Sequence, residues 1–474
     1  MKNREKGFAI SGILLASLIL FLALLLGILS VMASRKIVLD KEKNEIINEL
    51  DDVDNPNCNI QICNVDTSGA STPEIANGMI PIKWDGVKWI KADVHNREGN
   101  NQWYDYNKQQ WANVALVSEL TRSIYSNASV GIEVNENDIT AYLVWIPRYK
   151  YQLFNVSSES VSVQKINVIF ENRNVTKSLG STNGSYLTHP AFTFGDNELN
   201  GLWVGKFETT GTDTFPTIKP NSLSLTNQNI NNQFLTSRLF NNTELYGLSV
   251  ENDAHMMKNM EWGAVAYLSQ SDYGKYGNPI YTGVEGLEKE IYINNVNSDI
   301  NTGNGPGVTG CAGDSLNADM VRSITCPAGY AYYTINGVKA STTGNIYGIY
   351  DMNGGSWEYT VGGMYNSDDT TIMIANSGFD QSNIDNVDME KYINKYIYGT
   401  SYNDHNAYNR RQLGDATGEV RGWNGDSMLF VNTSYPWFPR GGYYNGGTAS
   451  GIFGFNHRTG AMGDNGTFRV VILG

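Results

Sequence analysis

The sequence predicts an α+β fold in which one long N-terminal helix precedes a body of short strands and loops. The first observation is an unbroken apolar run from Phe8 to Ala33, which no other segment approaches in length. The second is helix-like apolar spacing over 256–271, the best example in the rest of the chain. The third is the remainder, where short apolar stretches alternate with Gly- and Asn-rich loops up to a terminal strand at 467–473.

The apolar run is long enough to cross a membrane. As a helix it would extend about 39 Å, against a hydrocarbon core of about 30 Å. A polar leader, residues 1–7, precedes it, and an amphipathic extension continues the helix to residue 54, before Asn55-Pro56. We therefore predict a single membrane-spanning helix over 8–54, with the body of the chain held extracellularly at the cell membrane.

Composition excludes one class of partner. The net charge of −14 is spread along the chain, whereas nucleic-acid binding needs clustered Lys and Arg. We expect no nucleic-acid partner and interpret the acidity as a contribution to solubility. The 49 glycines and 28 tyrosines are typical of loop-rich β proteins displayed outside cells.

Four cysteines form two sequence-local pairs, Cys58 with Cys63 and Cys311 with Cys326. An even number in an exported chain favours two disulfides, each closing a short polar loop. Free thiols and a four-thiolate zinc site are the alternatives, and neither pair has the two-residue spacing of a zinc knuckle. The five histidines are scattered without a helical pair, so metal catalysis has no support in the sequence.

The body divides into a linker and two predicted domains. Residues 55–75 form a polar linker that contains the first cysteine pair, and residues 76–120 form a small aromatic-rich β module. Alternating apolar residues on both sides of Asp85-Gly86 predict a hairpin in this module. Its aromatic rings are expected to form a core, with sugar binding as the alternative. The large head spans 141–474.

The N-terminus resembles a type IV prepilin leader. Lys6-Gly7-Phe8 matches the basic-Gly-aromatic cleavage site, and the apolar helix follows at once. The resemblance implies cleavage after Gly7, Phe8 as a methylated N-terminus, and other pilins as partners. The chain departs from the family at Gly12, where pilins carry the Glu that neutralises a neighbouring subunit's amine inside a filament. An uncleaved signal anchor is the alternative.

The head resembles the formylglycine-generating-enzyme-like (sulfatase-modifying-factor) branch of the C-type lectin fold. Residues 143–147 look like the family's opening strand, and 345–359 are close to its signature, N-x-YGLYDM-x-GNVWEW. Residues 440–442 and 467–471 match its closing pattern, RGGSW…GFRV. Together these segments span most of the head, and they imply the C-type lectin fold for it.

The resemblance does not carry the family's activity to this chain. The formylglycine enzymes use a cysteine pair shortly after the RGGSW motif, and this chain has no cysteine after Cys326. The iron-dependent relatives need a multi-His site from an added helical domain, which is also missing. We therefore predict that the protein is not an enzyme. We expect no cofactor, with a structural calcium ion as the open alternative, because calcium is common in this fold.

A Tyr-, Asn- and Gly-rich segment stands where those enzymes carry their catalytic motif, and such a composition is typical of binding loops. In C-type-lectin-fold proteins diversified by retroelements, the same location is the variable ligand-binding surface, so the resemblance implies a paratope here. About half of the aromatic residues should face the core, namely Tyr443, Phe453, Phe455 and Phe468. The predicted exposed, ligand-binding set is Tyr444, Asn445, Asn456, His457, Thr459, Met462, Asp464 and Asn465.

These observations predict a membrane- or pilus-anchored cell-surface adhesin whose C-terminal loops bind an extracellular protein or glycan. The first alternative is a structural minor pilin or pseudopilin that acts in filament assembly or export. The second is a degenerate formylglycine-enzyme-like modifying enzyme, which would need a cofactor site that the sequence does not show. An adhesin head binds isolated ligands, whereas an assembly factor binds only sibling pilins.

Overall fold

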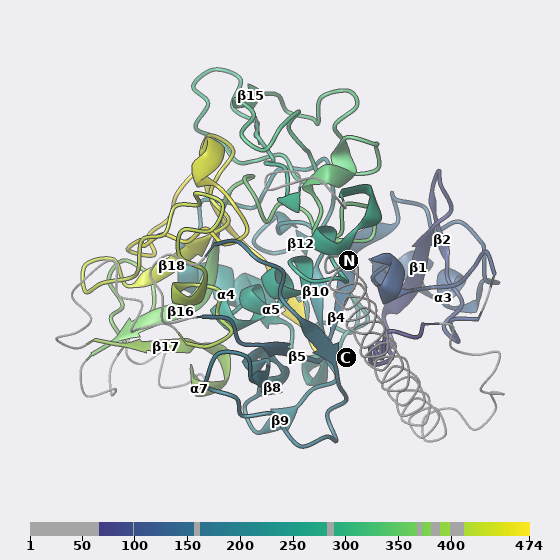
Figure 1. Cartoon of the computed structure of the whole chain (residues 1–474). Helices are drawn as coiled ribbons and strands as arrows, with labels where there is room; N and C mark the ends of the chain where they lie inside the picture. The colour runs from purple at the N-terminus through teal and green to yellow at the C-terminus, as the bar shows by residue number, and fades with distance from the viewer. Residues whose placement is uncertain are drawn as a thin grey trace, which may run out of the picture. The chain divides into compact units, whose positions relative to one another are not determined.

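A computed structural model of the chain describes residues 66–474 apart from Glu98, 156–161, 282–288, 367–371, 381–388 and 399–411 (Figure 1). The chain divides into two compact units, and the second, Asn64–Gly474, contains all of the described residues. Several predicted features lie outside the described residues: the leader 1–7 with its cleavage site Gly7–Phe8, the segment 8–54 with Gly12, and the pair Cys58 and Cys63.

The centre of the second unit is a seven-stranded antiparallel sheet with the order β13-β20-β10-β4-β3-β1-β2. Its strands are rich in Val, Ile and Trp, which suit a buried pleated surface. β4 lies in the middle of the sheet, and all of its residues are buried. The strands are β1 Met79–Trp84, β2 Trp89–Lys91, β3 Asn113–Val117, β4 Ile139–Pro147, β10 Gly201–Gly205, β13 His255–Met256 and β20 Val470–Ile472.

The predicted hairpin is confirmed, but it is part of this larger sheet. β1 and β2 pair with Trp84 opposite Trp89, and Gly86 in the turn has a φ of 108°, which glycine adopts without strain. β1 also pairs with β3, and β3 pairs with β4. Residues 76–120 and the start of the predicted head therefore share one sheet and one compact unit. The fully buried rings of Trp89 and Trp103 contribute to its core.

A second sheet carries the C-terminal loops. Its strands are β16 Trp357–Tyr365, β17 Asn394–Ile397, β18 Trp437–Arg440 and β19 Gly466–Phe468, and the other three all pair with β16. Arg440 lies opposite Glu358, and Gly466 lies opposite Trp357. The chain between β18 and β19 thus leaves and rejoins the sheet beside the first two residues of β16.

The remaining elements are short. The small sheets contain β5 Tyr149–Gln152, β6 Val168–Phe170, β7 Tyr186–Thr188, β8 Thr193–Phe194, β9 Asn197–Glu198, β11 Thr210–Gly211, β12 Pro216–Thr217, β14 Val296–Asn297 and β15 Val321–Arg322. The helices are α3 Glu119–Asn127, α4 Ile230–Arg238, α5 Asn259–Ser269 and the single turn α7 Met389–Tyr392. α5 falls within the helix predicted over 256–271, and it is buried along its whole length.

The α+β prediction is wrong for this part of the chain. The described residues form mostly strands and loops, with three helices of nine to eleven residues and one helical turn. The reason is compositional: the chain contains 49 glycines and 28 tyrosines, and these residues favour turns and strands over helices. Among the described residues, no helix is long and apolar enough to cross a membrane. The predicted membrane-spanning segment, 8–54, lies outside the described residues.

The disulfide predicted between Cys311 and Cys326 is confirmed. Their Cα atoms lie 5.4 Å apart, and fifteen positions of sequence separate them. The described part of the chain contains no free cysteine.

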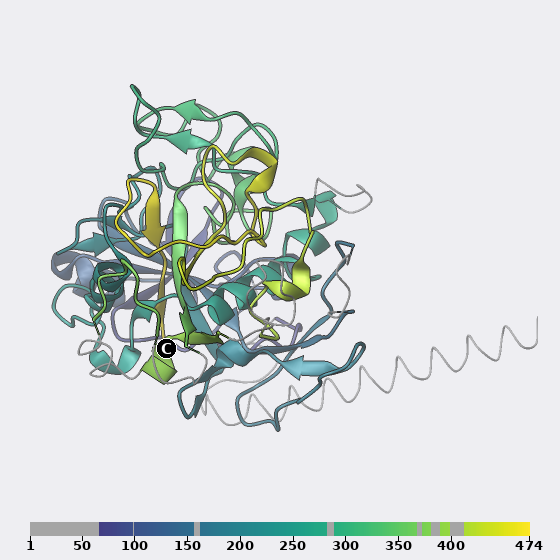
Figure 2. The same cartoon turned by 90° about the vertical axis from the view of Figure 1, so that its left-hand side faces the viewer.

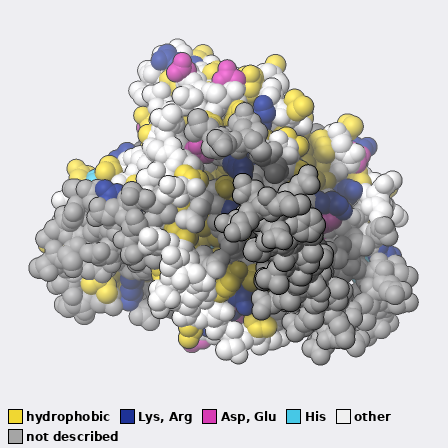
Figure 3. All heavy atoms as spheres, in the orientation of Figure 1, with side chains coloured by type: hydrophobic (Ala, Val, Ile, Leu, Met, Phe, Trp, Pro, Cys, Tyr) yellow, Lys and Arg dark blue, Asp and Glu magenta, His cyan; other side chains and the backbone are white. Residues whose placement is uncertain are grey.

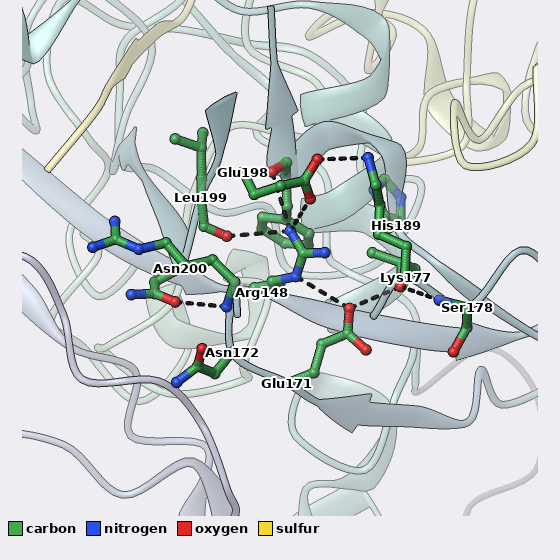
Figure 4. A network of polar contacts seen from close by, with 12 residues as sticks. Arg148, Glu171, Asn172, Lys177, Ser178, His189, Glu198, Leu199 and Asn200 are labelled. Carbon is green, nitrogen blue, oxygen red and sulfur yellow. Dashed lines mark hydrogen bonds and ion pairs between the residues drawn. The ribbon is translucent and has the colours of Figure 1, made fainter. Parts of the chain in front are cut away.

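A buried ionic network fastens the small β5–β6–β7 sheet to the central sheet (Figure 4). Arg148, which lies between β4 and β5, is completely buried, and its Nε lies 3.1 Å from Glu171 Oε1. Its Nη1 lies 2.7 Å from Glu198 Oε2, and Lys177 Nζ approaches the same carboxylate from the surface. Each buried charge has an opposite partner, so the network is structural. On the face shown in Figure 3, charged side chains are scattered among uncharged ones.

Candidate ligand-binding surface

The C-terminal loops, residues 441–465 between β18 and β19, rest on two buried arginines. The Arg440 guanidinium donates to Ala416 O at 2.7 Å and to Asp415 O at 3.0 Å, and burial lowers its pKa to about 10. Arg469, between β19 and β20, donates from Nε to Glu358 Oε2 at 2.8 Å. Burial raises the pKa of Glu358 to about 7 although this cation lies against it. Both ends of the loop segment are therefore anchored by charged hydrogen bonds below the surface.

Above this base, Trp357 lies at the centre of a stack. Its ring is parallel to that of Tyr443, with the centroids 5.9 Å apart and the planes at 19°. The guanidinium carbon of Arg458 lies 5.7 Å from the Trp357 ring centroid. Trp357 itself is buried, whereas Tyr443 is half-buried and Arg458 is exposed. The stack thus presents an aromatic ring and a cation to solvent on a rigid support.

A second stack lies on the neighbouring loop. The rings of Tyr435 and His457 are 5.0 Å apart and nearly parallel. His457 Nδ1 lies 2.9 Å from Phe430 O, which fixes the orientation of the imidazole. Because Tyr435 is 44% exposed, this stack also offers an aromatic face to solvent.

Most of the predicted binding residues reach the surface. Asn445, Met462 and Asp464 are exposed, and Asn456, His457, Thr459 and Asn465 are half-buried. The exception is Tyr444, which is only 2% exposed, so its assignment to the exposed set is wrong. Tyr443, which we assigned to the core, takes the outward position.

Tyr443 faces outward and Tyr444 inward, the reverse of the prediction, and the cause is local. The two glycines before them, Gly441 and Gly442, have φ angles of 80° and 78°, in the left-handed region. Two such residues turn the chain and break the in–out alternation that a continuing strand would have. Nothing in the amino-acid order alone shows which tyrosine faces out after such a turn.

Tyr444 is an internal anchor. Its N–H donates to Gly355 O at 2.8 Å, and its hydroxyl donates to Gly303 O at 3.4 Å. Burial, reinforced by the nearby Asp464 carboxylate, raises the pKa of Tyr444 to about 12. The hydroxyl therefore stays neutral and holds the loop against the turn that contains Gly303.

Three surface contributors were not in the predicted set: Tyr443, Arg458 and Tyr435. Arg458 could have been found, since Arg and Tyr together mark binding loops and it lies inside the loop segment. Tyr435 lies before β18, outside the segment that we considered. Trp357 comes from the fold signature, and only the structure shows that its ring supports the loops.

The described residues show no arrangement for metal chemistry. They contain no group of three or more His, Cys, Asp or Glu side chains that could hold a metal ion. The carboxylates of Glu208, Asp351 and Glu358 gather near Arg469 but are completely buried and hydrogen-bonded to protein groups.

No protein-family model matches the chain, and no curated protein matches it.

Proposed function

We propose that this protein is an adhesin-type binding protein that acts outside the cytoplasm and recognises an extracellular ligand through its C-terminal loops. The observation that carries the proposal is the stack of Tyr443, Trp357 and Arg458, which presents a ring and a cation on buried supports. The resemblance to the formylglycine-enzyme-like branch of the C-type lectin fold supports the same location. The disulfide between Cys311 and Cys326 favours an oxidising compartment.

The geometry favours binding over catalysis. Aromatic rings and Arg held rigidly contribute large contact area at low entropic cost, as hot-spot residues do. Small polar neighbours such as Asn445 and Thr448 are exposed around them and can adapt their hydrogen bonds. No cysteine follows Cys326, so the nucleophile of the enzymes that the head resembles is absent.

The test is binding of the full chain to arrays of glycans and of secreted or surface proteins. The double variant Tyr443→Ser, Arg458→Ser should lose the ligands bound by the wild type, by at least tenfold in affinity. The matched control is Lys150→Ser, Tyr186→Ser, because this pair also places a cation over a tyrosine ring, at 5.9 Å, on β5 and β7. Thermal melting checks that both variants are folded. If the two double variants bind equally well, the C-terminal loops are not the binding surface.

A further inference from the structure

The backbone of Arg458 is fixed to the sheet below the C-terminal loops. Its N–H donates to Trp437 O at 2.9 Å, and its carbonyl accepts the Trp437 N–H at 3.1 Å, so this part of the loops is paired with β18. β18 is paired in turn with β16, which Figure 2 shows as a green arrow beside the yellow strand β19. Arg458 therefore starts from a rigid base.

The side chain of Arg458 extends over one face of β16. Trp357 and Tyr359 are two residues apart on this strand, so their rings lie on the same face. The guanidinium carbon lies 5.7 Å from the Trp357 ring centroid. Burial raises the pKa of Tyr359 to about 12, and the nearby Arg458 charge acts against this rise. Both contacts place the cation above the two rings.

The Arg458 guanidinium has N–H groups to spare. A guanidinium carries five N–H donors, and among the described residues this one makes a single long hydrogen bond, from Nη1 to His457 O at 3.4 Å, and no ion pair. Within 441–465, Arg458 is the one Lys or Arg and Asp464 is the one acidic residue. Asp464 acts instead on Tyr444, whose pKa burial and then this carboxylate raise. The positive charge is therefore exposed without a carboxylate of this chain to pair with.

A fixed and unpaired guanidinium is suited to an oxyanion. Its planar fork of N–H groups matches the two oxygens of a carboxylate in charge-assisted hydrogen bonds. Two further groups lie beside it. The half-buried Tyr443 ring stacks on the same Trp357 ring, and the Asn456 N–H donates to Pro439 O at 3.0 Å, in register with Arg458. Because residues two apart in an extended pair share a face, the Asn456 amide lies on the same side as the guanidinium.

We propose that Arg458 binds a carboxylate of the ligand, and that the ligand is an acidic glycan carrying sialic or uronic acid residues. This inference rests on the proposed function of the C-terminal loops and names the chemistry of their ligand. The sugar ring packs on Tyr443, its hydroxyl groups meet the Asn456 amide, and its carboxylate meets the guanidinium. An acidic protein fits less well, because its many negative charges are repelled by the net charge of −14 on this chain.

The experiment applies the full chain to an array on which each acidic glycan is printed beside its carboxyl-reduced counterpart, where a primary alcohol replaces the carboxylate. The wild type should bind the acidic member about tenfold more tightly, as a hydrogen-bonded charge pair suggests. Arg458→Gln should lose this preference. Arg458→Lys, which keeps the charge but not the fork, should retain only part of it. The matched control is Arg97→Gln, which removes an exposed arginine between β2 and β3 and should retain the full preference. Thermal melting checks that each variant is folded.

The outcomes separate this inference from the proposed function. If acidic and reduced glycans bind equally, or if Arg458→Gln keeps the wild-type preference, this inference fails, and the proposed function stands as long as Tyr443→Ser, Arg458→Ser loses the bound ligands. An equal loss in Arg97→Gln overturns the specific role of Arg458. Binding to acidic proteins with no glycan bound overturns the glycan and leaves the proposed function standing. Silence on every array overturns both.

Discussion

Lys206 shows how much a single buried polar side chain contributes to this fold. It follows β10 and is completely buried. Its Nζ donates to Asn113 Oδ1 at 2.8 Å, Ile346 O at 2.6 Å and Gly348 O at 2.8 Å. Burial lowers the pKa of Lys206 well below its usual value. The ammonium links β3 to the loop before Tyr350, so it ties the central sheet to the signature segment.

Replacing Lys206 by Met should destabilise the protein by about 3 kcal/mol or more, because three buried oxygens would lose their donor and each unsatisfied group costs about 1–3 kcal/mol. Urea denaturation measures the change. The control is Lys88→Met on the exposed hairpin, which should leave the midpoint unchanged. Equal midpoints for the two variants would mean that the hydrogen bonds from Lys206 to these three oxygens do not stabilise the protein.

At the scale of elements, α5 contains a glycine at a position where alanine, the better helix former, would not fit. A glycine inside a helix is normally less stable than alanine by about 0.5–1 kcal/mol. Gly263 lies in the middle of α5, but a Cβ built there would come within 1.8 Å of Gly414 O. The helix packs directly on the backbone of the 412–426 segment, so the absent side chain permits the contact.

Gly263→Ala should therefore destabilise the protein by about 1–3 kcal/mol through overpacking, although helix propensity alone predicts a gain. Thermal melting of the variant gives the sign directly. Ser126→Ala on the exposed side of α3 is the control and should be neutral or slightly stabilising. A higher melting temperature for Gly263→Ala would show that α5 does not approach Gly414 closely.

The elements also show what the sequence could predict. The β1–β2 hairpin and α5 follow from local periodicity and from the Asp85-Gly86 turn, so both are found where the pattern places them. The pairing of β3 with β4 joins the predicted module 76–120 to the predicted head 141–474, and local periodicity does not show such a pairing. In the candidate site, composition singled out the loop segment, and two left-handed glycines decided which of its two adjacent tyrosines faces solvent.

At the scale of the whole molecule, a buried carboxyl group keeps its proton at neutral pH. Burial raises the pKa of Glu419 to about 8. Glu419 accepts hydrogen bonds from Tyr151 and Tyr267 and has no ion-pair partner among the described residues. Burial lowers the pKa of His189 to about 3. Protonation of this histidine therefore changes the free energy of unfolding only below about pH 6.5.

Stability should fall as the pH rises from 6.5 to 8.5. In this window the unfolded chain has already lost the carboxyl protons that the folded chain keeps, so the folded state binds more protons and each step up in pH disfavours it. Urea midpoints at pH 6.5, 7.5 and 8.5 measure the slope. Glu419→Gln should flatten the slope, because the amide needs no proton. A wild-type midpoint that rises across this window would contradict the assignment of these protons.

The pairing of β18 and β19 with the first residues of β16 has a consequence for how this protein can change over time. The two ends of the loop segment are fixed at one place in the sheet, and the outward positions between them are separated by buried anchors such as Tyr444 and Phe453. Substitutions at Asn445, Thr448, Arg458, Met462 or Asp464 alter the surface without disturbing a strand or the core. Lengthening the loops is also inexpensive, at roughly 0.6 kcal/mol for each doubling of a flexible loop. A lineage carrying this architecture can explore new specificities by point mutation or short insertion while inheriting the same folded scaffold.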